Sequence, residues 1–382
     1  MNLLFDYISC QGFYNGGAVY AERILNRLEL NSSVNIILLY NSELEILSYG
    51  GDVFNKYKTI DLKNKSIFDI IREYQIDVFL ILIAQRYSKL NFKNITCRCV
   101  VVIHDLVTLE YYGNRFHYLL SRDTREKFKF LIDMFFFNSY YHRIMKSYSF
   151  LKMIHENKKV HLCTVSNHTK HNILFYFPYF SEDEISVFYN PLDVDDNIRE
   201  ETSLNVPKDK KIILFFNANR VNKNAELVFA VMKRFLSEND SYIFVTTGID
   251  KRIHRRHYGF LSISENDKKW LLSKCEVLIY ASVAEGYGLP PIEALLYKKK
   301  VICSNIAPMR DILKNSVMYF SPFYENDLYR CLNLSKTFVP DYQLMDSLSE
   351  ELIAKGDDDT FRFIQFILTG NYGGSSTFSQ NS

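Results

Sequence analysis

The sequence predicts an α/β protein made of two domains, each built around a parallel β-sheet. Its 382 residues are too many for one ordinary hydrophobic core and suit two domains of about 150 to 200 residues each. Short apolar runs alternate with segments of helical periodicity in both halves, which is typical of strands that lie parallel in one sheet. A polar stretch without periodicity, residues 191–210, separates the halves and is expected to be a linker.

The first domain is expected to span residues 1–190. It opens with an apolar run at 3–9, a glycine-rich turn at 12–17 and a helical segment at 18–28, which is the order of a strand–turn–helix unit. The pattern predicts further strands at 35–40, 78–83, 99–103, 160–165 and 185–189, a helix at 67–74 and a helical, aromatic-rich stretch at 115–158.

The second domain is expected to span residues 211–355. The pattern predicts strands at 212–216, 242–246, 277–280 and 301–303, with helices at 225–235 and 267–272. A further helix is expected within 356–369. The Gly-, Ser- and Asn-rich residues 370–382 have the composition of a disordered tail.

Composition excludes several classes of protein. An apolar fraction of 47% and a charged fraction of 24% are those of a globular protein, and a net charge of +2 gives no general attraction to nucleic acid. The seven cysteines include no C-x-x-C pair, which argues against a disulfide framework or a structural zinc site and favours the cytoplasm. The N-terminal residues MNLLFDYISC lack a basic leader, and the longest apolar run, 78–84, is far shorter than the about 20 residues that span a bilayer.

The most informative segment, residues 285–294, reads EGYGLPPIEA and follows the apolar run 277–280. A strand, a turn with Gly286 and Gly288 and then a helix start make an anion site, because the free N–H groups of a helix N-terminus attract phosphate. Glu285 at its rim can accept hydrogen bonds from sugar hydroxyls, and Glu293 can accept them from a ribose. The alternative is a capping carboxylate at 285 and a solvated helix face at 293.

Two further groups of residues carry candidate chemistry. Arg220 and Lys223 lie in a turn after the strand 212–216, where two cations suit a pyrophosphate, although solvated turn residues are the alternative. His104 directly follows the strand 99–103, and open α/β sheets bind ligands at the carboxyl ends of their strands. No His, Cys, Asp or Glu cluster has the spacing of a metal site, so metal dependence is not expected.

The run from Trp270 to Pro308, WLLSKCEVLIYASVAEGYGLPPIEALLYKKKVICSNIAP, resembles the signature of the glycosyltransferase family 4 enzymes, which have the GT-B fold. Members of that family show E-G-F-G-L-P-P-x-E-A, then a glycine-containing turn and P-V-I-A-S. Tyr287 and Cys303 are mild departures from it. Lys298, Lys299 and Lys300 replace the small-residue turn, which predicts an altered loop beside the nucleotide.

The resemblance implies two Rossmann-like domains with parallel sheets facing across a cleft, the acceptor in 1–190 and the donor in 211–355, with 356–369 crossing back to the first domain. It implies that Glu285 holds the donor sugar, Glu293 the ribose, and Arg220 with Lys223 the donor phosphates. His104 would face the donor sugar across the cleft. The remaining donor-binding residues implied are Gly16, Gly17, Gly286, Tyr287, Gly288 and Leu289.

The expected function is therefore a retaining glycosyltransferase, without metal or other cofactor, that moves a hexose from a nucleotide diphosphate sugar to a saccharide or lipid-linked saccharide acceptor. Mannose is the first choice of hexose, and surface polysaccharide or O-antigen assembly is the expected setting. An epimerase-like GT-B enzyme and a catalytically silent sugar-nucleotide binder stay open as alternatives.

The stretch 111–161 is rich in Lys and Arg interleaved with Phe and Tyr. That composition predicts a surface that approaches the anionic inner face of the cytoplasmic membrane, where a lipid-linked acceptor is found. A helical pair with an aromatic core face and a solvated basic face is the equally weighted alternative. RNA binding would need the same features, but the sequence carries no RNA-binding module.

Overall fold

The computed structural model describes residues 1–12, 16–45, 53–112, 128, 131–132, 134–192 and 201–371. The chain divides into two compact units: unit 1 is Met1–Leu106, Met145–Leu192 and Ile353–Ser382, and unit 2 is Val107–Ile144 and Asp193–Leu352. Residues 107–144 thus group with unit 2, although the sequence placed them in the first domain. Residues 193–200 of the expected linker and 372–382 of the expected tail lie outside the described residues.

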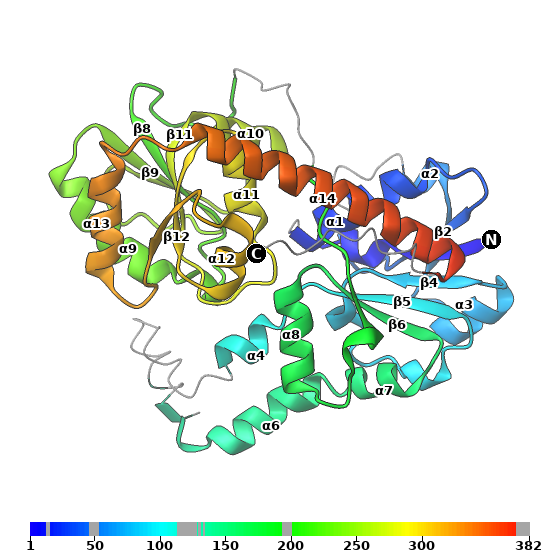
Figure 1. Cartoon of the computed structure of the whole chain (residues 1–382). Coiled ribbons are helices and arrows are strands. Elements are labelled where there is room, and N and C mark those ends of the chain that lie inside the picture. Colours follow the sequence, from blue (N-terminus) through cyan, green and yellow to red (C-terminus); the bar gives the residue numbers. More distant parts are fainter. Residues whose placement is uncertain are drawn as a thin grey trace. The chain divides into compact units, whose positions relative to one another are not determined.

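Unit 1 is built on a parallel sheet, to which the described residues contribute seven strands in the order β3-β2-β1-β4-β5-β6-β7 (Figure 1). The order reverses between β1 and β4, which is the point where open α/β sheets bind ligands. The strands are β1 (Asn2–Asp6), β2 (Asn35–Tyr40), β3 (Lys58–Asp61), β4 (Val78–Ile81), β5 (Arg98–Ile103), β6 (Val160–Thr164) and β7 (Ile185–Val187).

Helices alternate with these strands along the chain, as the sequence predicted. β4 is buried at every residue, which explains why it reads as a continuous apolar run. The helices of the first half are α1 (Gly16–Leu28), α2 (Val53–Lys56), α3 (Ile67–Glu73), α4 (Val107–Tyr112), α6 (Phe137–Ser147), α7 (Phe150–Glu156) and α8 (Asn167–Tyr176).

The first strand ends earlier than the sequence predicted because of Asp6. Its buried carboxylate accepts a hydrogen bond from the Ser9 backbone N at 3.2 Å and so caps a 3₁₀ turn, Tyr7–Cys10, in place of a longer strand. The same carboxylate accepts from the Tyr87 hydroxyl at 2.6 Å and from the Leu82 backbone N at 3.2 Å. Asp6 therefore joins the end of β1 to the chain that follows β4.

Unit 2 has a second parallel sheet, with six strands in the described residues in the order β10-β9-β8-β11-β12-β13. Its order reverses between β8 and β11, so the unit also has a ligand-binding switch point. The strands are β8 (Lys211–Phe215), β9 (Tyr242–Thr247), β10 (His257–Phe260), β11 (Cys275–Tyr280), β12 (Lys300–Ser304) and β13 (Met318–Phe320).

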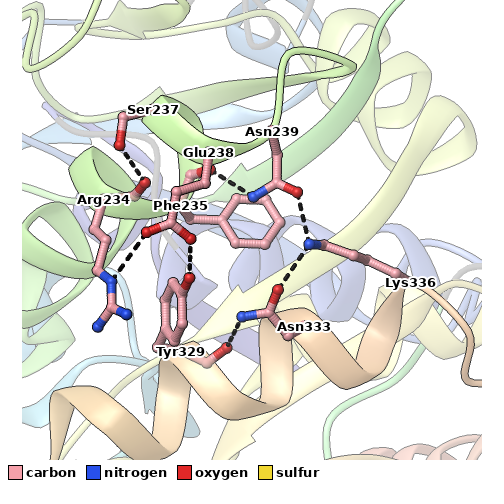
Figure 2. A network of polar contacts seen from close by, with 8 residues as sticks. All are labelled: Arg234, Phe235, Ser237, Glu238, Asn239, Tyr329, Asn333 and Lys336. Atoms are coloured by element: carbon pink, nitrogen blue, oxygen red, sulfur yellow. Dashed lines mark hydrogen bonds and ion pairs between the residues drawn. The ribbon is translucent and has the colours of Figure 1, made fainter.

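Two helices that pack together cover part of this sheet. α9 (Ala225–Glu238) and α13 (Glu325–Ser335) share an apolar core with β8, β9, β11 and β12, to which Phe235 of α9 and Leu332 of α13 belong. Figure 2 shows the polar contacts at their edge: Lys336 donates to Asn239 Oδ1 at 2.6 Å, and the Tyr329 hydroxyl donates to Glu238. These contacts hold the C-terminal end of α9 against α13; at its other end, α9 begins at Ala225, just after Lys223 and Asn224.

The last helix, α14 (Tyr342–Thr369), starts well before the segment in which the sequence predicted a helix. Gly356, followed by three aspartates, looks like a helix stop, yet it lies inside the helix. A Cβ on Gly356 would lie 2.7 Å from the Asn190 carbonyl oxygen, so the glycine permits a close approach between backbones. Residues up to Leu352 belong to unit 2 and those from Ile353 to unit 1.

Candidate active site

The loops after β8 and β11 meet at the switch point of the second sheet. The first loop is shaped by Asn217 and Asn224, which both have φ of +57°, and by the Asn224 side chain, which donates to the Pro322 carbonyl at 2.7 Å. Between these asparagines the 3₁₀ turn Val221–Lys223 turns Asn222 and Lys223 into the protein. The loop is therefore built to bury a lysine at the end of β8.

Lys223 and Glu285 form a buried ion pair. Lys223 Nζ lies 2.5 Å from Glu285 Oε1, and the two side chains are only 4% and 11% exposed. The Asn222 side chain holds the same oxygen, donating to Glu285 Oε1 at 3.2 Å and to the Ala284 carbonyl at 2.9 Å. Tyr280, the last residue of β11, accepts from Lys223 Nζ at 3.0 Å, and its ring centroid lies 4.3 Å from that nitrogen.

The electrostatics of this cluster favour an ionised carboxylate. Burial alone raises the pKa of Glu285, but the charge of Lys223 and hydrogen bonds from Lys223 and Tyr280 bring that pKa below the ordinary glutamate value. Burial raises the pKa of the Tyr280 hydroxyl, and the Glu285 charge raises it further. The cluster thus consists of a carboxylate and an ammonium surrounded by neutral hydrogen-bonding groups. Its carboxylate can accept a hydrogen bond from a hydroxyl of a ligand.

The glycine turn after Glu285 leads into α11 (Leu289–Leu296). Gly288 has φ of +84°, a left-handed conformation that favours glycine, and a Cβ there would also displace the end of the Met309 side chain, whose Cε lies 2.5 Å away. Gly286 and Tyr287 are buried beside it. The prolines 290 and 291 lie in the first helical turn, where backbone N–H groups have no helical partner.

Glu293 lies in the second turn of α11 and does not join the Lys223 cluster. Its Oε1 accepts from Lys268 Nζ at 2.8 Å, and Lys268 belongs to α10 (Glu265–Lys274). The two carboxylates of the motif therefore have separate cationic partners: Lys223 from the loop after β8 and Lys268 from helix α10.

Arg220 is exposed, unlike Lys223, and the structure does not bring the two cations together at Glu285. Within the described residues, no hydrogen bond or ion pair joins its guanidinium to a side chain. The buried hydroxyl of Ser282 also belongs to the cluster and helps to lower the pKa of Glu285. The buried hydroxyl of Ser304 has no hydrogen-bond partner in the described part of the chain.

His104 lies in unit 1, at the carboxyl end of β5. Its Nε2 donates to the Leu82 carbonyl at 2.9 Å, and its ring meets Tyr20 edge-on with centroids 4.9 Å apart. Burial lowers the pKa of His104 to about 4, so the imidazole is neutral at pH 7. Tyr20 comes from α1, whose first residues are Gly16 and Gly17, so the expected glycine turn is in part the start of this helix.

Sequence reasoning missed three residues that hold the candidate carboxylates. Asn222 adjoins Lys223, and its amide next to a candidate cation was a usable signal. Tyr280 was counted as one of four apolar strand residues, which hides its hydroxyl. Lys268 is 25 positions from Glu293, and no local spacing links two residues that far apart.

The described residues contain neither a cluster that could hold a metal ion nor a helix long and apolar enough to cross a membrane. All seven cysteines are buried free thiols. Of the basic stretch 111–161, residues 113–127, 129–130 and 133 lie outside the described part of the chain.

The comparisons with known proteins point to one family. Residues 196–328, which include the Glu285 loop, match the family model of the Glycosyl transferases group 1. The O-antigen chain mannosyltransferase RfbU of Salmonella typhimurium is 28% identical over 188 residues, which cover 46% of this chain and 50% of RfbU. The match therefore spans about half the length of that relative.

Solved structures resemble the chain over nearly its whole length. Anabaena Alr3699/HepE in complex with UDP and glucose has a TM-score of 0.65 at 12% identity, covering 97% of this chain and 99% of that one. WaaG, a glycosyltransferase involved in lipopolysaccharide biosynthesis, has a TM-score of 0.59 at 12% identity, covering 97% and 100%. At such identities the likeness concerns the fold. With a match to the Glycosyl transferases group 1 model over residues 196–328, two parallel-sheet units and a likeness to WaaG over nearly its whole length, the chain has the GT-B fold.

Proposed function

We propose that the protein is a glycosyltransferase that moves a hexose from a nucleoside diphosphate sugar to a saccharide hydroxyl. The observation that carries the proposal is the buried Lys223–Glu285 pair at the switch point of the second sheet, beside the glycine turn that starts α11. A carboxylate kept ionised there suits sugar hydroxyls, and a helix N-terminus suits a phosphate.

In this proposal each candidate residue binds a different part of the donor. Glu285 accepts from hydroxyls of the donor sugar, and the N-terminal turn of α11 at Leu289 receives the diphosphate. Lys223 and the exposed Arg220 supply the positive charge that stabilises the leaving diphosphate. Their charge takes the place of a metal ion. Glu293 accepts from the ribose. Gly16 and Gly17 at the start of α1 are proposed to bind the donor, because glycine lets a diphosphate approach the backbone closely. The neutral imidazole of His104 can exchange hydrogen bonds with sugar hydroxyls.

The proposed reaction retains the anomeric configuration. The bond from the anomeric carbon to the diphosphate breaks, the acceptor oxygen bonds to that carbon on the same face, and the leaving phosphate oxygen takes the acceptor proton. Mannose is the proposed hexose, and assembly of a surface polysaccharide is the proposed setting. Both are supported by the name of the relative, the O-antigen chain mannosyltransferase RfbU.

Activity is tested by incubating the protein with GDP-mannose and UDP-hexoses, with and without a panel of saccharide acceptors, and by measuring release of nucleoside diphosphate and formation of product. Glu285→Gln should lower kcat about a hundredfold, because it removes a charged acceptor that holds the sugar. Glu276→Gln is the matched control, since Glu276 lies near the start of β11, the strand that precedes the Glu285 loop, and pairs with Lys300 at 2.9 Å.

The outcomes separate the rival functions. Product that depends on the acceptor supports transfer, whereas an epimer formed without acceptor would point to an epimerase-like enzyme. Binding of a nucleoside diphosphate without any product favours a silent binder. Equal activity of the two glutamine variants would remove Glu285 from the site.

We further propose peripheral contact with the inner face of the cytoplasmic membrane, where a lipid-linked acceptor would lie. Four apolar side chains in the described part of the basic stretch, Phe128, Ile132, Phe135 and Phe136, are 45 to 78% exposed. Arg143 and Lys146 of α6 are exposed nearby in sequence. Exposed aromatic residues with neighbouring cations suit an anionic lipid surface.

Flotation with vesicles tests the membrane contact. Vesicles that contain phosphatidylglycerol should carry the protein, and vesicles of phosphatidylcholine alone should not. The double variant Phe135→Ser, Phe136→Ser should lose this binding, while Phe361→Ser, which changes another exposed phenylalanine, should keep it. Unchanged flotation of the double variant would contradict the proposal.

A further inference from the structure

The two oxygens of Glu293 have different surroundings. Oε1 accepts a hydrogen bond from Lys268 Nζ at 2.8 Å. Oε2 is buried as well, but among the described residues it has no hydrogen-bond partner. The side chain as a whole is only 13% exposed. One half of the carboxylate is therefore held, and the other half is an acceptor without a donor.

The backbone at Lys268 is held in place by the carboxylate of its neighbour, Asp267. Asp267, the preceding residue in α10, accepts hydrogen bonds from the Ser264 hydroxyl at 2.7 Å, from the Thr202 hydroxyl at 2.6 Å and from the Ser203 backbone N at 2.9 Å. These bonds hold the pKa of Asp267 at about 2, below the usual aspartate value despite its burial. The first turn of α10 is thus anchored, and Lys268 projects from a fixed point.

A buried carboxylate oxygen without a donor is unfavourable, and a ligand hydroxyl that donates to it relieves that cost. An isolated negative charge at this place would also repel a diphosphate, whereas the ammonium of Lys268 neutralises it. Lys268 itself has its nitrogen 3.8 Å from Glu265 Oε1, so it is shared between two carboxylates of neighbouring helices. Its contacts orient Glu293 and do not compete for Oε2.

We propose that Lys268 is a positioning residue for nucleotide recognition: it fixes Glu293 so that Oε2 accepts a hydrogen bond from a ribose hydroxyl of the donor. This inference rests on the proposed function, because it needs a nucleotide in the site. On this proposal, the Lys268–Glu293 ion pair between α10 and α11 is what makes the protein bind ribonucleotides more tightly than deoxyribonucleotides.

The test compares nucleotide binding with and without the ribose hydroxyls. The probes are UDP and GDP with their 2′-deoxy and 3′-deoxy forms, titrated by calorimetry into the full chain. Lys268→Met removes the charge and keeps the length of the side chain. Lys300→Met is the matched control, because the Lys300–Glu276 pair has a similar length of 2.9 Å and similar exposure, 16% and 27% against 19% and 13%.

The wild type should bind the ribonucleotide about tenfold more tightly than the deoxy form that lacks the hydroxyl facing Glu293, which is the strength of one hydrogen bond to a charged group. Lys268→Met should lose that preference, in addition to the weakening that both nucleotide forms share because Glu293 is left without its counter-charge, and Lys300→Met should keep it. A Lys268→Met variant that keeps the preference for ribo over deoxy forms, whatever its absolute affinity, overturns the inference. If the wild type binds no nucleoside diphosphate, the proposed function itself fails.

Discussion

At the scale of single residues, the buried charges of the candidate site form an ion pair. Lys223 and Glu285 neutralise each other inside unit 2, and removing one partner of such a pair costs about 3 to 5 kcal/mol because the other is left charged and buried. Glu285→Gln leaves the ammonium of Lys223 without its counter-charge, so its folding has to be checked beside its activity. His104 is the opposite case, a buried titratable group kept neutral.

His104 predicts a specific dependence of stability on pH. Its folded-state pKa of about 4 lies below the value of 6.5 expected in the unfolded chain, so between these values the unfolded chain binds the proton more strongly. Its contribution is fully present above pH 6.5 and is lost as the pH falls toward 4. The loss reaches about 3 kcal/mol at most.

Urea unfolding at pH 7 and pH 4.5 checks this prediction. His104→Gln removes the titrating ring, so its free energy of unfolding should fall less than that of the wild type between the two pH values. The readout is the change in the free energy of unfolding between the two pH values and not its absolute value, because the substitution also changes packing against Tyr20. Parallel pH profiles for the two proteins would contradict it.

The sequence pointed to Glu285, Lys223 and Glu293 because they lie in a dense local pattern. It did not reveal Tyr280 or Lys268, whose roles depend on where a strand ends and on how two helices adjoin. The pattern placed both Arg220 and Lys223 at the donor phosphates. Only the turn at Asn222 decides that one is buried and the other exposed.

At the scale of elements, Lys298 and Lys299 form a regular helix end, and Lys300 is the first residue of β12. Lys298 N donates to the Leu295 carbonyl at 2.8 Å and Lys299 N to the Ala294 carbonyl at 2.9 Å, the two bonds of a Schellman motif, with Lys298 at φ of +55°. The turn closes the C-terminal end of α11, which lies about 12 Å along the helix from Gly288. The three lysines therefore replace the family's small-residue turn by an ordinary helix end that leads into β12, and an altered loop beside the nucleotide stays a prediction.

This geometry predicts that Lys298→Gly stabilises unit 2. Glycine adopts a left-handed conformation at no steric cost, so the gain is about 1 kcal/mol, less a small loss from the exposed contact with Asp346. Urea unfolding should show it. Lys298→Ala is the control, because it loses the ion pair and keeps the backbone cost, and it should be no more stable than the wild type. Equal stability of both variants would mean that the left-handed turn carries no strain.

Element prediction succeeded where strands are buried on both faces and failed where a local signal misled. The strands at 78–81 and 98–103 follow from their continuous apolar runs. The sequence did not predict β10 or β13, which are only four and three residues long and partly exposed. Gly356 hid the true length of α14, because a glycine before aspartates usually ends a helix.

At the scale of the whole molecule, unit 1 depends on the end of the chain. Phe363 and Phe366 of α14 are fully buried, and both contact Phe188 just after β7. Asp359 of the same helix accepts from the Tyr189 backbone N at 3.1 Å. The C-terminal part of α14 is thus a structural element of the unit that holds the N-terminus.

Truncation after Leu352 should consequently damage unit 1 and spare unit 2. Hydrogen exchange should show lost amide protection in β5, β6 and β7, while β8, β9 and β11 keep theirs and nucleotide binding persists. The substitution Phe361→Ala, at an exposed position of α14, is the control and should change neither unit. Equal loss of protection in both units would contradict the division.

The Schellman turn at Lys298 also bears on how this protein would be re-engineered. A directed-evolution library aimed at a new donor sugar should leave residues 298–300 unchanged, because the turn needs a left-handed residue at 298 and Lys300 already belongs to β12. Randomising 217–221, 282–284 and 265–268 would sample the walls around Glu285 and Glu293. Position 298 is better reserved for raising the thermal tolerance of the parent before such a library is built.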